Sequence, residues 1–551
     1  MKVREYFRTG DAWVWLNAGS VAICLIMVVG LLGLVASRGL GHFWTADVMQ
    51  ASYSDNGTTQ TIIGELFDEK VDTAARLREA GVDIPAGVHH VTRYSIKQGN
   101  KDVTGQDFRW VMADKLTNRQ YPEDIVRLER LEWGNFYGRL MSVKESGNPV
   151  ASGEAAWAEF NKRLERSNSI HDQISDIEKG PIGSINFKLE ELRLEERRLQ
   201  LKNQLNDAAL KRLAGERDAL NKGYETLRLQ LEKLNQDLSR DSAVFSIADG
   251  SEREIPIGKI VAASRPNAMG VFAKTGAYLH NLWGFLADDP REANTEGGVF
   301  PAIFGTVLMV LIMTVIVTPL GVIAAIYLRE YASQGVVTQT VRIAVNNLAG
   351  VPSIVYGVFG LGFFVYFLGG SMDRLFYPEA APSPVFGTPG LLWASITLSL
   401  LTLPVVIVAT EEGLSRIPRA LKEGSLALGA TKAETLWRVV LPMATPSIMT
   451  GMILAIARAA GEVAPLMLVG VVKLAPTLPL DMNAPFLHME RKFMHLGFHI
   501  YDVGFQSPNV EAARPVVYAT AFLLVLVVAV LNLSAVGLRN RLREKYKALE
   551  T

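Results

Sequence analysis

The amino-acid sequence predicts an all-α membrane protein, in which six membrane-spanning helices carry a large polar insert between the first and the second. Six apolar stretches are long enough to cross a bilayer. The charges are also segregated: residues 37–298 hold 35 basic and 40 acidic side chains, and the other residues hold 21 and 16. The formal net charge of zero is therefore the sum of −5 in residues 37–298 and +5 in the other residues. Neither part is basic enough to indicate nucleic-acid binding.

Each predicted span provides about 20 mostly apolar residues, the length that a helix needs to cross the hydrocarbon core. The spans are expected at 14–36, 299–328, 341–368, 391–410, 442–472 and 515–538. The first is longer than the apolar region of a signal peptide, about 7–15 residues, and Val35-Ala36-Ser37 is not an A-x-A cleavage site. We therefore expect it to be an anchor helix.

Lys and Arg in the short flanking segments predict the orientation, because they accumulate on the cytoplasmic side. With the N-terminus inside, the cytoplasmic segments carry 15 of these residues and the opposite side carries 5, the long insert being left out. Both termini are thus expected in the cytoplasm and the insert outside it. The expected parts are a tail and first helix (1–36), the insert (37–298), a membrane core (299–538) with a cytoplasmic loop (411–441), and a basic tail (539–551).

The insert is expected to be largely helical. Apolar residues between Trp157 and Ile177 follow three- and four-residue spacing, and Gly180-Pro181-Ile182-Gly183 is expected to end that helix. Leucines seven residues apart then resemble a coiled-coil seam, which Asn206 interrupts: Leu192, Leu199, Leu213, Leu220, Leu227 and Leu234. An antiparallel hairpin over about 154–240 is the simplest arrangement, and it could be a spacer or a docking arm. Short alternating runs within 53–143 leave room for a small mixed subdomain.

The sequence contains no catalytic motif. The phosphate loop G-x-x-x-x-G-K-[ST] is absent, so the chain is not expected to hydrolyse ATP itself, and H-E-x-x-H and G-x-S-x-G are absent too. The only cysteine, Cys24, lies in an apolar run, which excludes an intrachain disulfide. His89 and His90 are adjacent without further ligands nearby. We expect neither a metal nor another cofactor on this chain.

Between the fourth and fifth spans, residues 422–442 are expected to form a compact knob on the cytoplasmic face. This stretch resembles the coupling motif of ATP-binding-cassette importer permeases, E-A-A-x3-G-x9-I-x-L-P, although Val439 replaces the isoleucine. Gly424 and Ser425 replace the two alanines and stay small enough for a partner's groove to close around them. The expected coupling residues are Glu423, Gly424, Ser425, Gly429, Ala430, Leu441 and Pro442. Because no ATP site is present, the ATPase would be a separate protein.

Two further stretches narrow the resemblance. Residues 347–357 (N-L-A-G-V-P-S-I-V-Y-G) and 454–466 (L-A-I-A-R-A-A-G-E-V-A-P-L) are similar to the phosphate-importer permeases of the PstA type. The likeness covers about residue 299 to the C-terminus, and the insert is similar to a variant of that family. It implies a type I importer permease fold in the bacterial cytoplasmic membrane and phosphate transport by alternating access. It also implies a second permease of the PstC type, two cytoplasmic ATP-binding subunits that use ATP, and an extracytoplasmic phosphate-binding protein.

Arg458 and Glu462 are the predicted substrate-path residues. A charge within a bilayer costs about 2.5–3.5 kcal/mol on insertion scales, so an intramembrane ionisable residue is a functional candidate. The two are four residues apart, so they share a helical face and can pair. A span starting near Pro446 would put Arg458 about 18 Å deep, beyond the midplane. A purely structural ion pair is the alternative interpretation.

Weaker candidates for the path, or for a hinge, are Gly350, Pro352, Ser353 and Tyr356, since Gly-x-Pro frees backbone groups; a plain packing kink is the alternative. One arginine does not discriminate between tetrahedral anions, so a permease for sulfate, molybdate or phosphonate stays open. A membrane sensor or signalling scaffold that uses the leucine-rich insert is the alternative of a different class.

Overall fold

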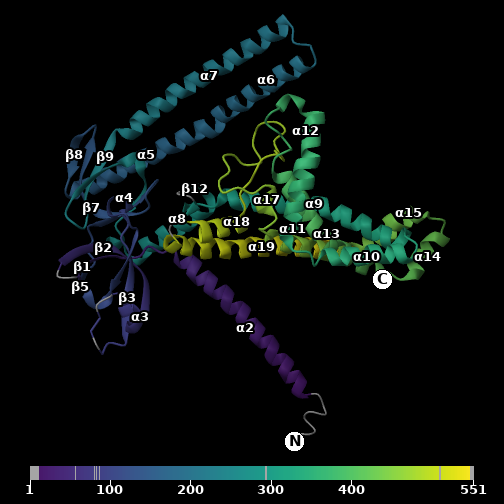
Figure 1. The fold of residues 1–551 in the computed structure, drawn as a ribbon, viewed down its shortest axis with the longest axis horizontal. Coiled ribbons are helices and arrows are strands. Elements are labelled where there is room, and N and C mark those ends of the chain that lie inside the picture. Colours follow the sequence, from purple (N-terminus) through teal and green to yellow (C-terminus); the bar gives the residue numbers. More distant parts are fainter. Residues whose placement is uncertain are drawn as a thin grey trace, which may run out of the picture.

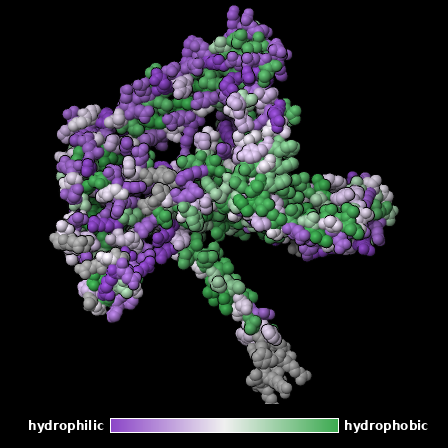
Figure 2. Space-filling view, in the orientation of Figure 1, coloured by the Kyte–Doolittle hydropathy of each residue, from purple (hydrophilic) through white to green (hydrophobic). Residues whose placement is uncertain are grey.

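The computed structural model describes residues 11–55, 58–79, 81, 84–85, 87–291, 294–507 and 510–546. Figure 1 shows an elongated bundle of helices with a domain at one end, from which a long two-helix arm runs back over the bundle toward α12. Within the described residues, six helices are long and apolar enough to cross a membrane, as predicted. They are Trp13–Gly41, Phe300–Tyr331, Ser353–Phe376, Leu391–Ser415, Lys432–Ala460 and Ala513–Arg541. Figure 2 shows the bundle and the first helix as hydrophobic and the arm and domain as largely hydrophilic.

The membrane part is organised around α13, which packs against α9 and α16. Its long elements are α2 (Asp11–Gly41), α9 (Phe300–Ile326), α10 (Val336–Leu348), α13 (Leu391–Ser415), α16 (Leu441–Ala460) and α19 (Val510–Tyr546). The shorter ones are α11 (Ser353–Phe359), α12 (Gly370–Phe376), α14 (Arg419–Ala427), α15 (Lys432–Thr435), α17 (Leu466–Val469) and α18 (Leu496–Tyr501). Gly321 and Gly451 let α9 and α16 approach α13, because a Cβ at either would come within 2.8 Å of a side chain on α13.

Two predicted spans differ from the structure. The third is divided: α10 ends at Leu348, and a new helix runs without interruption from Ser353 through a π-helical stretch, Gly360–Gly369, to Phe376. The fifth ends at Ala460, twelve residues before its predicted end. Pro352 explains the first difference and Gly461 with Pro465 the second, because these residues interrupt helices unless neighbours compensate. Both interruptions bear on the candidate site.

The first sheet of the insert has five antiparallel strands in the order β4-β3-β2-β1-β5. They are β1 (Val48–Asp55), β2 (Thr58–Thr73), β3 (His90–Lys97), β4 (Phe108–Met112) and β5 (Leu116–Gln120), accompanied by α3 (Ala74–Glu79) and α4 (Lys101–Thr104). Met49, Ile62, Ile96 and Val111 form its core. The sheet occupies the region where short alternating runs allowed a mixed subdomain.

The second sheet has the order β10-β9-β7-β6-β11, and β8 pairs with β7. Its strands are β6 (Ile125–Arg130), β7 (Phe136–Glu145), β8 (Asn148–Ser152), β9 (Asp241–Ser246), β10 (Glu252–Pro256) and β11 (Ile260–Ser264). Phe160 of α5 (Glu154–Ile177) packs edge-on against Phe245, which packs likewise against Phe136. The prediction of a largely helical insert missed these two sheets, whose eleven strands hold 79 of the described residues. The whole arm lies between β7 and β9 in the sequence, although the two strands pair. Pairing between strands so far apart cannot be recognised from the local sequence pattern.

The arm is a hairpin whose turn lies elsewhere than predicted. The chain does not leave the helical conformation at Gly180. After α5 ends at Ile177, a π-helical turn, Glu178–Ile182, accommodates Pro181 and leads directly into α6 (Gly183–Leu201). The chain reverses at residues 202–206, and the Asn206 side chain accepts a 2.8 Å hydrogen bond from the Ala209 amide to start α7 (Asp207–Ser239). The leucine series is therefore divided between two antiparallel helices, which Figure 1 shows lying side by side.

The arm and the domain are joined to the bundle by α8 (Val271–Ala287) and a two-stranded ribbon, β12 (Pro290–Arg291) and β13 (Glu296–Gly297). The outer end of α2 packs on α19, where a Cβ on Gly39 would come within 2.9 Å of the Ala519 backbone. From that contact α2 diverges from the bundle (Figure 1), and its apolar side chains are exposed along its length. A helix with apolar residues on all faces is stable there only in lipid or against another protein.

Candidate functional site

Arg458 lies in the last turn of α16, and its side chain is 32% exposed. The helix ends two residues later, and the chain turns through Gly461, whose amide still donates to the Arg458 carbonyl at 3.3 Å. Glu462 follows this turn, with its carboxylate Oε1 3.7 Å from Arg458 Nε. That distance is too long for a hydrogen bond. The two groups form a loose ion pair, so the guanidinium keeps hydrogen-bond donors for another partner.

The position of Arg458 along its span differs from the prediction. Helix α16 begins at Leu441 rather than near Pro446, and it continues an apolar helix from Lys432. Seventeen residues at about 1.5 Å each place Arg458 about 26 Å along α16, near the C-terminal end of the span. The predicted depth of about 18 Å was counted from Pro446, and α16 extends five residues further toward its N-terminus than that.

The break in the third span lies beside this pair. Tyr356 of α11 is buried and lies within electrostatic reach of Arg458. A Cβ on the next residue, Gly357, would come within 2.6 Å of Pro465 Cα, so α11 and the segment after Glu462 are in close contact. The structure thus places α11 against the segment that follows Glu462, although about 100 residues separate them in the sequence.

The other residues predicted around this break have different positions. Gly350 and Pro352 are exposed, and Ser353 is half-buried at the start of α11. The Tyr356 hydroxyl donates a 2.6 Å hydrogen bond to the Leu348 carbonyl, which closes the interruption between α10 and α11. Tyr356 therefore joins the two helices, whereas Gly350 and Pro352 lie in the break itself.

The predicted coupling residues form a compact projection, which we call the knob, from α14, α15 and the π-helical turn Leu436–Val440. Glu423 and Gly424 are exposed on α14, and Gly429 has φ +90°, the left-handed conformation that ends this helix. Thr431 and Glu434 form a reciprocal capping box that starts α15. Ser425 Oγ lies 2.9 Å from Thr435 Oγ1 and joins the two helices. Leu441 and Pro442 begin α16, so the knob is continuous with the span that carries Arg458.

Sequence reasoning missed the residues that hold the knob against the bundle. Lys422 forms an ion pair with Glu330 at the end of the second span. Lys432 donates to the Glu330 carbonyl and lies 4.4 Å from the ring centroid of Tyr331. Nothing in the local sequence pattern relates Glu330 to a lysine 92 residues away. The surface of the knob stays apolar in places: Leu428 is 91% exposed and Trp437 is exposed as well.

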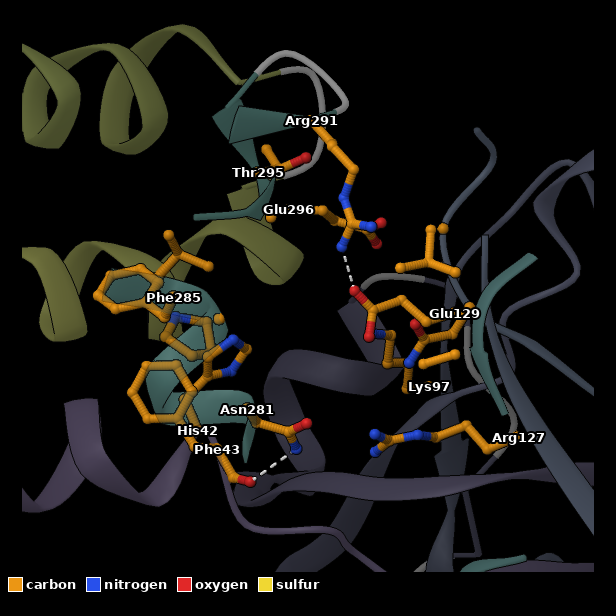
Figure 3. Close-up of a pocket in the computed structure, with 18 of the residues that line it drawn as sticks. His42, Phe43, Lys97, Arg127, Glu129, Asn281, Phe285, Arg291, Thr295 and Glu296 are labelled. Atoms are coloured by element: carbon orange, nitrogen blue, oxygen red, sulfur yellow. Dashed lines mark hydrogen bonds and ion pairs between the residues drawn. The ribbon is translucent and has the colours of Figure 1, made fainter. Parts of the chain in front are cut away.

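A second polar region lies under the insert, in a cavity of about 1320 Å³. Figure 3 shows Lys97, Arg127 and Glu129 of the sheets facing Asn281 and Phe285 of α8 across this space. His42, directly after α2, also lines it and is exposed to the cavity. The surrounding protein atoms, together with the charges of Lys97 and Arg127, lower the pKa of His42 to about 4. Acidic side chains balance these cations: Glu129 pairs with Arg291, and Glu65 lies 3.5 Å from Arg127.

Comparison with known proteins places the chain in a family. The model for the binding-protein-dependent transport system inner membrane component matches residues 317–547. Phosphate transport system permease protein PstA 1 of Mycobacterium tuberculosis is 35% identical over 276 residues, which cover 49% of this chain and 79% of that protein. The probable ABC transporter permease protein YqgI of Bacillus subtilis is 32% identical over 271 residues, 48% of this chain and 85% of that protein.

Among solved structures, a chain of the inward-facing MetNI methionine ABC transporter aligns with a TM-score of 0.32 at 19% identity, over 47% of this chain and 97% of that chain. The family assignment therefore rests on the sequence relatives, which are membrane permease subunits and not enzymes themselves. This chain belongs to the inner membrane components of binding-protein-dependent transport systems, and it is a PstA-type permease subunit of an ABC importer.

Proposed function

We propose that this chain carries inorganic phosphate across the membrane by alternating access, with Arg458 as the residue that meets the anion. The observation that carries the proposal is the placement of Arg458 in a membrane span, half-buried, loosely paired and next to a helix break. The relatives that print phosphate transport in their names favour phosphate as the cargo.

Arginine has the chemistry for this role. Its planar guanidinium stays charged and offers a fork of donors that matches a phosphate. Glu462, 3.7 Å away, offsets the charge at rest without occupying the donors in hydrogen bonds. An arginine without a nearby carboxylate would bind a divalent anion tightly, whereas a nearby carboxylate lowers the affinity for the anion. Release to the other side of the membrane requires such weakening, because a carrier must let go of its substrate.

The break at residues 349–352 serves as a path element or a hinge in this proposal. Irregular backbone at membrane depth is tolerated where it is covered by protein or lines a cavity, and discontinuous helices commonly form substrate sites in transporters. Tyr356 bonds the two sides of the break to each other, and α11 packs against the segment that follows Glu462, so a movement of α10 relative to α11 would displace the ion pair. Gly350, Pro352 and Ser353 would provide the flexibility.

The knob is proposed to be the surface on which the partner ATPase acts. An ATPase that closes on Glu423, Gly424, Ser425, Gly429 and Ala430 would push through Leu441 and Pro442 into α16. The exposed Leu428 and Trp437 offer apolar surface at this position. The chain itself would bind no cofactor, and ATP would be used by two copies of a cytoplasmic ATP-binding subunit.

The proposed complex contains a second permease of the PstC type and an extracytoplasmic phosphate-binding protein. Similarity to a PstC of Mesorhizobium japonicum, 33% identical over 205 residues, is consistent with two related permeases side by side. In the bacterial inner membrane both termini would be cytoplasmic and the insert extracytoplasmic, following the distribution of Lys and Arg.

The test is anion uptake by the reconstituted complex containing Arg458→Gln. Phosphate uptake should fall at least about tenfold, because a hydrogen bond to a charged group contributes about 1.5–3 kcal/mol. Arg374→Gln is the matched control, since Arg374 is exposed on α12 and its Nε donates only to the Gly370 carbonyl of its own helix. Retention of the ATP-binding subunits would show that the complex is assembled. Near-normal phosphate uptake by an assembled Arg458→Gln complex would refute the role of Arg458 in binding the anion. If the parent complex accumulated sulfate or molybdate and not phosphate, the proposed substrate would be wrong.

A further inference from the structure

Helix α8 has an outward apolar face that no described residue covers. Phe272 is 95% exposed, Trp283 67% and Leu279 59%. At 100° per residue, these three side chains fall within about 40° of one another on the helix. An exposed stripe of this kind marks an interaction surface in a soluble protein, and a lipid-facing surface next to a membrane.

The opposite side of α8 is occupied and polar. Asn281 donates a 3.2 Å hydrogen bond to the Phe43 carbonyl, and Lys274 pairs with Asp47 at the start of the insert. His280 and Gly284 line the cavity under the insert. The helix is therefore amphipathic, with its polar side toward the insert and its apolar side away from it.

The position of α8 identifies what lies on the apolar side. Tyr278 contacts Phe43 and Trp44, two and three residues after the end of α2, with ring centroids 6.5 and 6.1 Å apart. Phe285 is buried in one cluster with Val299, which precedes α9. The helix thus lies at the level where one span leaves the membrane and the next enters it. Tryptophan and tyrosine are enriched at that level in membrane proteins.

We propose that α8 lies in the membrane interface on the insert side, with Phe272, Leu279 and Trp283 in lipid. Its lipid-facing stripe would be continuous with the exposed apolar surface of α2, against whose end it packs. The helix would seat the insert on the bilayer surface and close the cavity of Figure 3 toward the membrane. The proposal is independent of which anion the permease carries.

Site-directed spin labelling tests this placement directly. Cys24 is the only cysteine, so Cys24→Ser gives a background for single labels at Phe272→Cys and Leu279→Cys. The full chain, assembled with its partner subunits, would be placed in nanodiscs of phosphatidylethanolamine and phosphatidylglycerol. Molecular oxygen, which concentrates in lipid, and a water-soluble nickel chelate would serve as relaxing agents. His280→Cys on the cavity side of the same helix and Leu229→Cys, exposed on α7, are the matched controls.

Labels at positions 272 and 279 should relax several-fold more with oxygen than with the nickel chelate, and the label at position 229 should show the reverse. Nickel accessibility at 272 and 279 equal to that at 229 would place the stripe in water and overturn the proposal. Protection from both agents at 272 and 279 would overturn it too, because another protein chain would then cover the face.

Discussion

Arg198 of α6 donates two hydrogen bonds to the same oxygen of Glu379, at 2.6 and 3.0 Å, across 181 residues of sequence. Glu379 belongs to the short helical turn Pro378–Ala380 between the third and fourth spans, and its side chain is 3% exposed. The contact ties the arm of the insert to a loop of the membrane core. The Phe187 ring, also on α6, lies 5.8 Å from that of His488 in a second loop of the core. The arm is therefore braced on the membrane part at two places.

Removing Arg198 should release the arm at neutral pH. In Arg198→Gln a buried carboxylate loses its cation, which costs about 1–3 kcal/mol. Hydrogen exchange should rise in α6 and in residues 378–390. Arg193→Gln is the matched control, because among the described residues Arg193 pairs with Glu190 alone, on the surface of the same helix. Equal exchange in both variants would show that the Arg198 contact does not hold the arm.

The same contact predicts acid sensitivity. Burial raises the pKa of Glu379, but the hydrogen bonds and charge of Arg198, a backbone hydrogen bond and the charge of Lys202 together outweigh it and hold the pKa below the usual 4.5. A carboxylate with a lowered pKa stabilises the fold above its unfolded value and loses this effect as the pH falls through the folded value. The brace should therefore persist at neutral pH and open only below about pH 4.5. Exchange in α6 that rises already between pH 7 and 6 would contradict this.

Gly429 and Gly424 provide a paired test of the knob. Gly429 has φ +90°, where an L-residue is strained, so Gly429→Ala should destabilise the knob by about 1–2 kcal/mol. Gly424 lies within α14, and a Cβ added there would meet only open space, so Gly424→Ala should stabilise the helix by about 0.5–1 kcal/mol. Hydrogen exchange of residues 419–435 measures both. Similar protection in the two variants would mean that the left-handed position does not determine the shape of the knob.

Buried histidines predict loss of stability in mild acid. Burial lowers the pKa of His495 to about 3, so the folded protein keeps this ring neutral while the unfolded chain protonates below about pH 6.5. Each pH unit below that value costs about 1.4 kcal/mol, or about 2 kcal/mol at pH 5. His495 Nδ1 accepts from the Gly497 amide at 3.1 Å, a role that asparagine can fill.

His495→Asn should therefore lose less thermal stability than the parent protein between pH 7.5 and pH 5. His499, whose pKa burial lowers to about 4, would account for acid sensitivity that remains. His90→Gln, at an exposed position, is the control and should keep the parent profile. An unchanged pH profile in His495→Asn would show that His495 does not titrate on unfolding as expected.

The ion pair at the candidate path should matter more for transport than for stability. Its 3.7 Å separation and partial exposure limit its contribution to at most about 1 kcal/mol. Glu462→Gln should thus unfold at nearly the parent temperature while the rate of phosphate uptake falls several-fold, because the anion would be held more tightly. A large loss of stability with normal uptake would instead support a purely structural pair.

Local features were predictable from the sequence. The six spans are visible because length and apolarity are properties of a contiguous segment, and the knob is visible because its spaced motif lies within 20 residues. Arg458 and Glu462 stand out as charges in an apolar run. The break near Pro352 was recognised as a candidate, but its effect on the third span was not, since neighbouring helices decide whether a proline bends or interrupts a membrane helix.

The sequence alone therefore determined the number of membrane spans, the family and the residues to mutate first. Only the tertiary structure decided that α11 packs against Pro465, that Lys422 pairs with Glu330, that β9 returns to β7 and that Arg198 braces the arm on Glu379. These contacts join residues separated by tens to nearly two hundred positions. Each depends on where whole helices and strands come to lie, and the spacing of residues along one segment carries no record of that.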